Sequence, residues 1–101
     1  MSSQRVVVIT GGNSGMGQAM AAAFVQANEH VVIIGRSEGR LRATAQELGS
    51  NVTWLKADVS QRSQVAGAVA AIIEQFGHVD VLINAAGFVL GVTTDLPLSQ
   101  S

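Results

Sequence analysis

Residues 5–24, RVVVITGGNSGMGQAMAAAF, decide the fold. The unbroken apolar run Val6–Ile9 is typical of a strand that is buried on both faces. A loop with glycine at positions 11, 12, 15 and 17 follows, and then an alanine-rich segment with high helix propensity. A strand, a glycine loop and a helix in this order predict a phosphate-binding turn. The first N–H groups of the helix have no partners inside it and carry a partial positive charge, so they favour an anion.

The glycines of this loop have separate expected tasks. We expect Gly11 to turn the chain sharply off the strand and Gly15 to let backbone N–H groups approach a ligand, while Gly17 allows close packing of the helix. The spacing Gly-x-x-x-Gly-x-Gly, preceded by Thr10, differs from the Gly-x-Gly-x-x-Gly of long-chain dehydrogenases. It also differs from a P-loop, because Gln18 stands where that loop needs a lysine. A structural turn explains one or two of these glycines, but not all of them in this context.

Outward from this stretch, apolar runs alternate with helical patterns. Strands are predicted at 6–9, 30–34, 52–55 and 79–83, and the first and third helices at 14–28 and 61–76. Residues 35–39 break the pattern, and Leu41, Ala45 and Leu48 then have the spacing of the second helix. Short βα connections with right-handed crossovers predict one α/β domain over residues 1–101. We expect a Rossmann-type, three-layer α/β/α fold with a parallel sheet in the order 3-2-1-4. The ligand is then expected at the carboxyl ends of the strands, where strands one and four adjoin.

Finer expectations concern the helices and the end of the chain. The first helix is predicted to face the sheet with Met20, Ala23, Phe24 and Ala27. Ser60 is the predicted N-cap of the third helix, and glycines 49 and 77 are predicted to end the second and third helices. Residues 88–101 lack periodicity, so no fifth strand is expected. Strand 79–83 would then be an edge, through which the isolated chain would aggregate or pair.

The composition excludes several classes of function. The net charge of −1 offers no basic excess for nucleic acid or for an anionic membrane surface. No cysteine is present, so disulfides and thiolate metal sites are impossible. Apolar runs are too short for a membrane span, and residues 1–4 have no secretory pattern, so we expect a cytoplasmic protein.

The end of strand two predicts the choice of cofactor. An acid at this position would bind the ribose hydroxyls of NAD, whereas an arginine accommodates the 2′-phosphate of NADP. Arg36 and Ser37 follow the strand, and the first carboxylate comes only at Glu38. We therefore expect NADP(H) to be preferred over NAD(H), the alternative for Arg36 being a solvated loop residue. A methyltransferase is disfavoured, because its fold expects an acid at the end of strand two.

Polar residues also end strands three and four. Asp58 is either a turn or N-cap residue or part of adenine recognition, and the sequence leaves these alternatives open. Asn84 is followed by three small residues, which allow close approach of a ribose. His30 and His78 begin strands at the opposite edge and are expected to be structural or solvated.

Three motifs in register carry a family resemblance. Residues 10–17 (TGGNSGMG), 58–59 (DV) and 84–87 (NAAG) resemble those of the short-chain dehydrogenase/reductase family, over about residues 5–87. Within this family, the sequence looks most like reductases of the 3-oxoacyl-(acyl-carrier-protein) reductase type. The one small departure is Ala85, where the family usually has a second asparagine.

The resemblance implies roles for these motifs. It implies that the glycine loop holds the pyrophosphate, that Asp58 and Val59 contact adenine, and that 84–87 supports the sheet beside the nicotinamide ribose. Arg36 matches the basic position of the NADP-preferring branch. The predicted cofactor-binding residues are Thr10, Gly11, Asn13, Ser14, Gly15, Met16, Gly17, Arg36, Ser37, Asp58, Val59, Asn84, Ala85, Ala86 and Gly87.

The catalytic residues of the family have no counterpart in these 101 residues. The chain contains no tyrosine, and its only lysine, Lys56, lies at a strand end. The family's serine and Tyr-x-x-x-Lys are expected to follow later, so this chain is interpreted as the cofactor-binding part of an oxidoreductase. Such an enzyme interconverts a small-molecule carbonyl and an alcohol by hydride transfer, and the resemblance implies a homo-oligomer at full length. The alternative is a stand-alone nucleotide-binding module without chemistry of its own.

Overall fold

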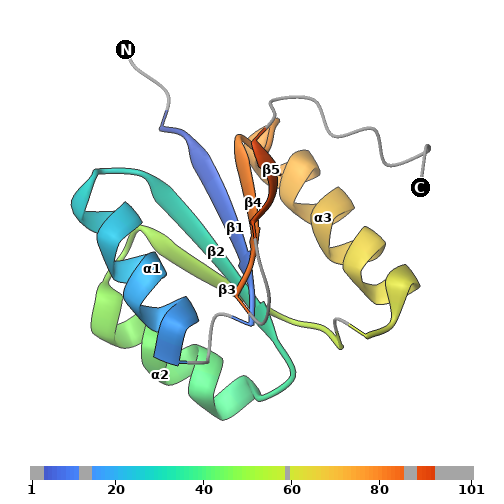
Figure 1. Cartoon of the computed structure of the whole chain (residues 1–101), viewed down its shortest axis with the longest axis horizontal. Helices are drawn as coiled ribbons and strands as arrows, with labels where there is room; N and C mark the ends of the chain where they lie inside the picture. The colour runs from blue at the N-terminus through green and yellow to red at the C-terminus, as the bar shows by residue number, and fades with distance from the viewer. Residues whose placement is uncertain (1–3, 12–14, 59, 86–88, 93–101) are drawn as a thin grey trace.

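The structure, a computed structural model, describes residues 4–11, 15–58, 60–85 and 89–92, the last four by their backbone alone. Strands and helices alternate along most of this length (Figure 1). In chain order the elements are β1 (Val6–Thr10), α1 (Gly15–Gln26), β2 (His30–Gly35), α2 (Glu38–Leu48), β3 (Val52–Lys56), α3 (Arg62–Phe76), β4 (Val81–Asn84) and β5 (Val89–Val92).

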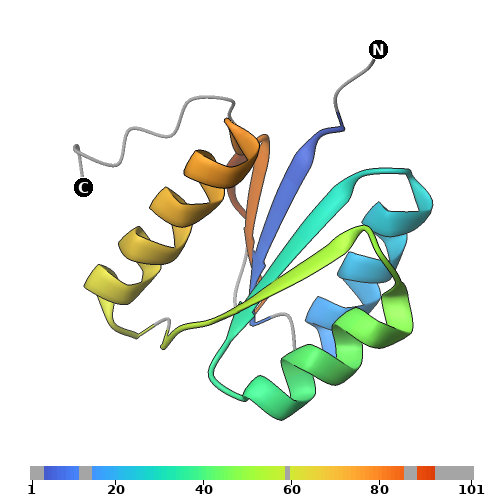
Figure 2. The ribbon, with the colours of Figure 1, turned by 180° about the vertical axis from the view of Figure 1, so that it is seen from behind.

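The strands form one sheet in the order β3-β2-β1-β4-β5. The first four strands are parallel, which confirms the predicted order 3-2-1-4. Helices α1 and α2 cover one face of the sheet and α3 covers the other, as Figure 1 and the opposite view in Figure 2 both show. The fold is therefore the expected three-layer α/β/α arrangement.

The central strands are buried on both faces, as their apolar runs predicted. All five residues of β1 are buried, and alternate side chains enter two separate cores. Val7 and Ile9 join the core under α1 and α2, whereas Val6 and Val8 join the core under α3. Burial of one such side chain contributes about 1.5–3 kcal/mol. These two cores hold the strand ends in fixed positions relative to one another.

The fifth strand contradicts the sequence-based expectation. Backbone groups of β5 pair with β4 in antiparallel direction, with a register irregularity between Leu82 and Ile83. Our prediction relied on side-chain periodicity, which a four-residue strand containing Gly91 does not display. Within this chain β4 is therefore not an edge strand, and pairing of the isolated chain through β4 loses its structural basis.

The sheet-facing side of α1 was predicted only in part. Met20 and Phe24 pack on the core as expected, but Ala23 and Ala27 are exposed. The buried positions are instead Gly17 and Ala21. An alanine-rich helix is apolar on nearly every side, so its sequence does not define which side is buried.

The start of α3 and the start of β4 also differ from the sequence-based predictions. Ser60 does not cap α3, because its backbone N–H and its hydroxyl both donate to Oδ1 of Asp58, and Gln61 occupies the N-cap position. β4 begins at Val81, later than predicted, and the preceding Asp80 is bonded to β1: its N–H donates to the Val6 carbonyl (2.9 Å), and its carboxylate accepts the N–H of Val6 (2.7 Å). Glycines 49 and 77 follow α2 and α3 with positive φ, as predicted.

Candidate functional site

The carboxyl ends of β1 and β4 lie side by side at one edge of the sheet. Thr10 and Asn84 are paired in register, and the Ala85 N–H donates to the Thr10 carbonyl (2.9 Å). From this point the chain leads from β1 to α1 on one face, whereas α3, which precedes β4, covers the other face (Figure 1). This is the switch in strand order at which parallel α/β sheets bind ligands.

The first turn after β1 depends on Gly11. Its φ of 75° lies in the left-handed region, and its N–H donates to the Ile34 carbonyl at 2.7 Å. Residues with a Cβ adopt this conformation at a cost, so glycine suits the position. The predicted sharp exit from the strand is thus present at Gly11.

Thr10 fixes the strand ends rather than presenting a free hydroxyl. Its side chain is 4% exposed, and its Oγ1 donates to the Ile83 carbonyl (3.3 Å). This bond ties β1 to β4 beside the site. Asn84 is half-buried, and Ala85 is buried against the core below α1. The small Ala85 side chain is compatible with that packing.

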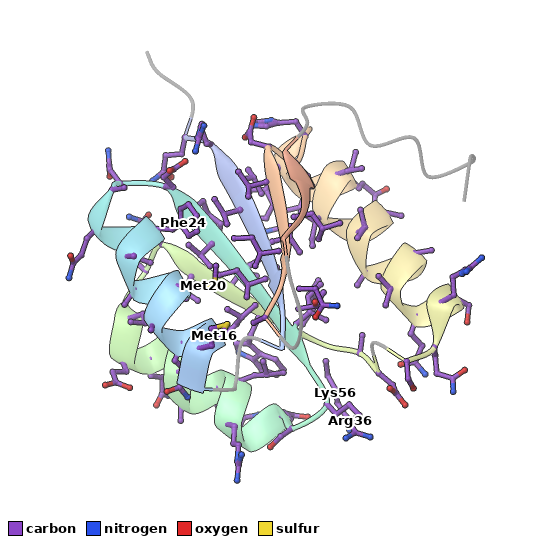
Figure 3. All side chains as sticks on the ribbon, viewed as in Figure 1. Met16, Met20, Phe24, Arg36 and Lys56 are labelled. Atoms are coloured by element: carbon purple, nitrogen blue, oxygen red, sulfur yellow. The ribbon has the colours of Figure 1, made fainter. Side chains whose placement is uncertain are left out.

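The start of α1 is open on its outer side. Gly15 is exposed, and a Cβ built at this residue would meet nothing within 4 Å. No acidic side chain occupies the first turn of α1, so the partial positive charge of the helix end is not offset there. Gly17 is buried, in keeping with its predicted role in close packing. Met16 is 61% exposed and lies at this end of the helix (Figure 3).

Two predicted cofactor-binding residues follow β2: one is exposed to solvent, and the other caps helix α2. Arg36 is exposed, and within the described ranges it forms no ion pair. Ser37 is the N-cap of α2, where its Oγ accepts the N–H of Arg40 (3.4 Å). Glu38, the first carboxylate after the strand, pairs with Arg42 at 2.5 Å. In the parts of the chain that are described, the Arg36 guanidinium is thus not held in an ion pair with a carboxylate.

Asp58 has the structure of a turn residue. Its Oδ1 accepts from the backbone N–H (3.0 Å) and the hydroxyl (2.7 Å) of Ser60, while its own N–H donates to Oε1 of Gln64 (2.8 Å). The bonds from Ser60, and to a smaller extent the charge of Arg36, lower the pKa of this carboxyl. Of the two alternatives left open by the sequence, the turn is observed, and a contact to adenine remains a prediction.

Five predicted residues lie outside the described part of the chain: Asn13, Ser14, Val59, Ala86 and Gly87. The described members of the predicted set come from β1, α1, β2, the β3–α3 connection and β4, and the carboxyl edge brings these segments together.

Lys56 is a residue of this edge to which the sequence assigned no role. It is exposed and ends β3, with Gly35 as its register partner in β2. Figure 3 shows Lys56 and Arg36 next to each other beyond the ends of these strands. The signal in the sequence was its position at the end of a strand, two residues before Asp58.

The histidines lie at the opposite, amino edge. Nε2 of His30 is 2.8 Å from Oγ1 of Thr53, and burial lowers the pKa of His30. Nε2 of His78 lies 2.9 Å from Oδ2 of Asp80. These contacts agree with the structural role that was expected for both. None of the helices in the described ranges has the length and apolar character of a membrane span.

Known proteins are similar to this chain in sequence. Residues 5–100 match the short chain dehydrogenase family. The NADP-dependent 3-hydroxy acid dehydrogenase of Salmonella typhimurium is 37% identical over 87 residues, which cover 86% of this chain and 35% of the relative. The chain spans about a third of the length of the curated relatives that it matches.

Two solved structures show the same arrangement of elements. A 3-ketoacyl-(acyl-carrier-protein) reductase from Brucella melitensis, complexed with NADH, is 36% identical with a TM-score of 0.75, over 80% of this chain and 34% of the other. A variant of actinorhodin polyketide ketoreductase with NADPH is 32% identical with a TM-score of 0.77, over 83% of this chain and 34% of the other. The similar proteins thus include examples with NADH and with NADPH.

Proposed function

The chain belongs to the short chain dehydrogenase family, and on this premise we propose that it is the cofactor-binding part of an NADP(H)-dependent oxidoreductase. The proposed reaction is hydride transfer between the nicotinamide and a small carbonyl or alcohol substrate. Membership of an oxidoreductase family supports the general type of reaction. The cofactor preference and the larger protein are our proposals.

The carboxyl edge supports dinucleotide binding by its shape and charge. Gly15 leaves open space at the start of α1, where a pyrophosphate can accept backbone N–H groups without meeting a side chain. The first turn of α1 contains no carboxylate that would repel it. The available space and the partial positive charge of the helix end therefore fit the group that the family is expected to bind. When bound, NADP(H) supplies the hydride, and the residues of this chain hold and orient it.

Arg36 is the single observation that carries the preference for NADP(H). It is exposed at the end of β2 and forms no ion pair within the described ranges, while nearby Glu38 is already paired with Arg42. A guanidinium makes forked, charge-assisted hydrogen bonds to a phosphate, and a ribose without the 2′-phosphate offers it no such partner. The Salmonella relative, whose name includes NADP dependence, supports the same preference.

Protonation of the carbonyl oxygen in the proposed reaction requires catalytic groups that these 101 residues do not contain. The chain has no tyrosine, and Lys56 has no tyrosine partner within it. We propose that a serine and a Tyr-x-x-x-Lys motif, as the family resemblance implies, belong to further sequence of the same protein. We propose that the whole protein acts on a small-molecule substrate and binds neither a nucleic acid nor a membrane. We further propose that the whole protein is cytoplasmic and forms a homo-oligomer; sedimentation would test the oligomeric state, and cell fractionation would test the location.

The test compares two cofactors and two arginines. In the full-length protein, Arg36→Ala should weaken NADPH binding by ~1.5–3 kcal/mol, the range for hydrogen bonds to charged groups, while NADH binding stays nearly constant. Titration of reduced-nicotinamide fluorescence measures both affinities. Arg5→Ala, at the amino edge, removes the same charge from a different place and should change neither. Equal losses for NADPH and NADH in Arg36→Ala would contradict the proposed role of Arg36.

A further inference from the structure

The ends of β2 and β3 place a second cation beside Arg36. Lys56 is the register partner of Gly35, and the N–H of Ala57 donates to the Gly35 carbonyl at 2.8 Å. Neighbouring strands lie about 4.8 Å apart, so the backbone of Lys56 runs directly beside the residue that precedes Arg36. Figure 3 shows both side chains extending beyond the same end of the sheet.

The carboxylates around these two cations have other partners. Glu38 is paired with Arg42, and Oδ1 of Asp58 accepts two hydrogen bonds from Ser60. Across residues 4–11, 15–58 and 60–85, neither Arg36 nor Lys56 forms an ion pair. The charge of Arg36 contributes to the lowered pKa of Asp58, so the Asp58 carboxylate is within electrostatic range of Arg36 without forming an ion pair with it.

Two adjacent like charges that form no ion pair in the described ranges favour an anion with more than one negative charge. A phosphate monoester meets this condition, because it carries a charge of about −1.5 to −2 near neutral pH. A pyrophosphate diester at the start of α1 has different surroundings, since Gly11 and Gly15 contribute backbone and no side-chain charge there. The cation pair is therefore matched to the additional phosphate that distinguishes NADP(H) from NAD(H).

We propose that Lys56 is a second specificity-determining residue, which binds the 2′-phosphate monoester of NADP(H) together with Arg36. This inference rests on the proposed function, because it assumes that the dinucleotide lies along the carboxyl edge. Arg36 provides directed, forked hydrogen bonds, whereas the lysine ammonium provides a compact charge on a flexible stem. Loss of Lys56 should accordingly be milder than loss of Arg36.

The test is a titration of the full-length protein with NADPH, NADH, 2′,5′-ADP and 5′-AMP. Lys56→Gln should weaken binding of NADPH and of 2′,5′-ADP by about two- to fivefold, the range for an exposed charge pair. Binding of NADH and 5′-AMP should change by less. Lys56→Arg keeps the charge and should retain the preference for the phosphorylated ligands. Arg5→Gln removes one charge from the amino edge and should alter none of the four affinities.

The outcomes separate this inference from the proposed function. A wild-type preference for NADPH that falls in Arg36→Ala but is unchanged in Lys56→Gln would overturn the role of Lys56 and leave the proposed function intact. A wild-type protein with no preference for NADPH would overturn both. β3 is an edge strand, where a lysine also hinders pairing with other chains. Self-association of Lys56→Gln in sedimentation, with unchanged affinities, would assign Lys56 that structural role and overturn the inference.

Discussion

The two edges of the sheet use their polar residues in opposite ways. At the amino edge, polar side chains bind one another or the backbone. Arg5 pairs with Glu29 at 2.6 Å, His30 contacts Thr53, and Asp80 accepts from the Val6 N–H. At the carboxyl edge, Arg36 and Lys56 are exposed and form no ion pair within the described ranges.

This difference separates stability from binding within one small sheet. A polar group that is satisfied inside the protein holds the fold, since leaving it buried without a partner costs about 1–3 kcal/mol. A charged group that is left in solvent costs little and is available to a ligand. Asp58 and Ser37 show that the separation is not complete, because both lie at the carboxyl edge and hold local turns. The contrast predicts that changes at the two edges have different consequences.

A change at the start of α1 should have the strongest effect on binding. Gly15→Val should abolish binding of both NADPH and NADH, because a β-branched side chain fills the open space that the pyrophosphate needs. Isothermal titration of the folded variant measures this loss. Gly67→Val is the matched control: Gly67 is also exposed and its Cβ also meets nothing within 4 Å, but it lies within α3. Near wild-type affinity in folded Gly15→Val would refute the phosphate-binding role of the loop.

A change at the amino edge should affect stability and leave binding unchanged. Asp80→Ala removes the acceptor of the Val6 N–H, and Val6 is only 2% exposed. We expect the free energy of unfolding to fall by roughly 1–3 kcal/mol, as measured by urea denaturation. Asp80→Asn keeps an acceptor and should recover part of this loss. The ratio of NADPH to NADH affinity should stay constant in both variants, and a changed ratio would show that the two edges are coupled.

The architecture could be predicted because it depends on features that are local in the sequence. Apolar runs such as Val6–Ile9 admit only a buried strand, and short βα connections leave few possible strand orders. The turn at Gly11 and the helix ends at Gly49 and Gly77 were also predictable, since positive φ selects for glycine. Strand order and helix ends then define where the site lies.

The errors arose where a distant or unusual partner decides the outcome. The sequence did not reveal that the carboxylate of Asp80, just before β4, accepts the N–H of Val6, which is 74 residues away. β5 exists because β4 offers it a pairing edge, although its own sequence has no clear strand pattern. The sequence left the turn at Asp58 as one of two alternatives. It did not reveal that Ser37 caps α2 or that Lys56 lies beside Arg36. To predict such contacts, one must know the register of neighbouring strands.

Hydrogen exchange of the full-length protein, with and without saturating NADPH, measures most directly whether the carboxyl edge is the cofactor site. Amides at Gly11, at residues 15–17 and at the ends of β2 and β4 should exchange more slowly when NADPH is present. Amides of the amino edge, at Val6, His30 and Asp80, should be unchanged at the same ligand concentration. Slower exchange confined to the amino edge, or no change at the carboxyl edge under saturation, would contradict the assignment of the site.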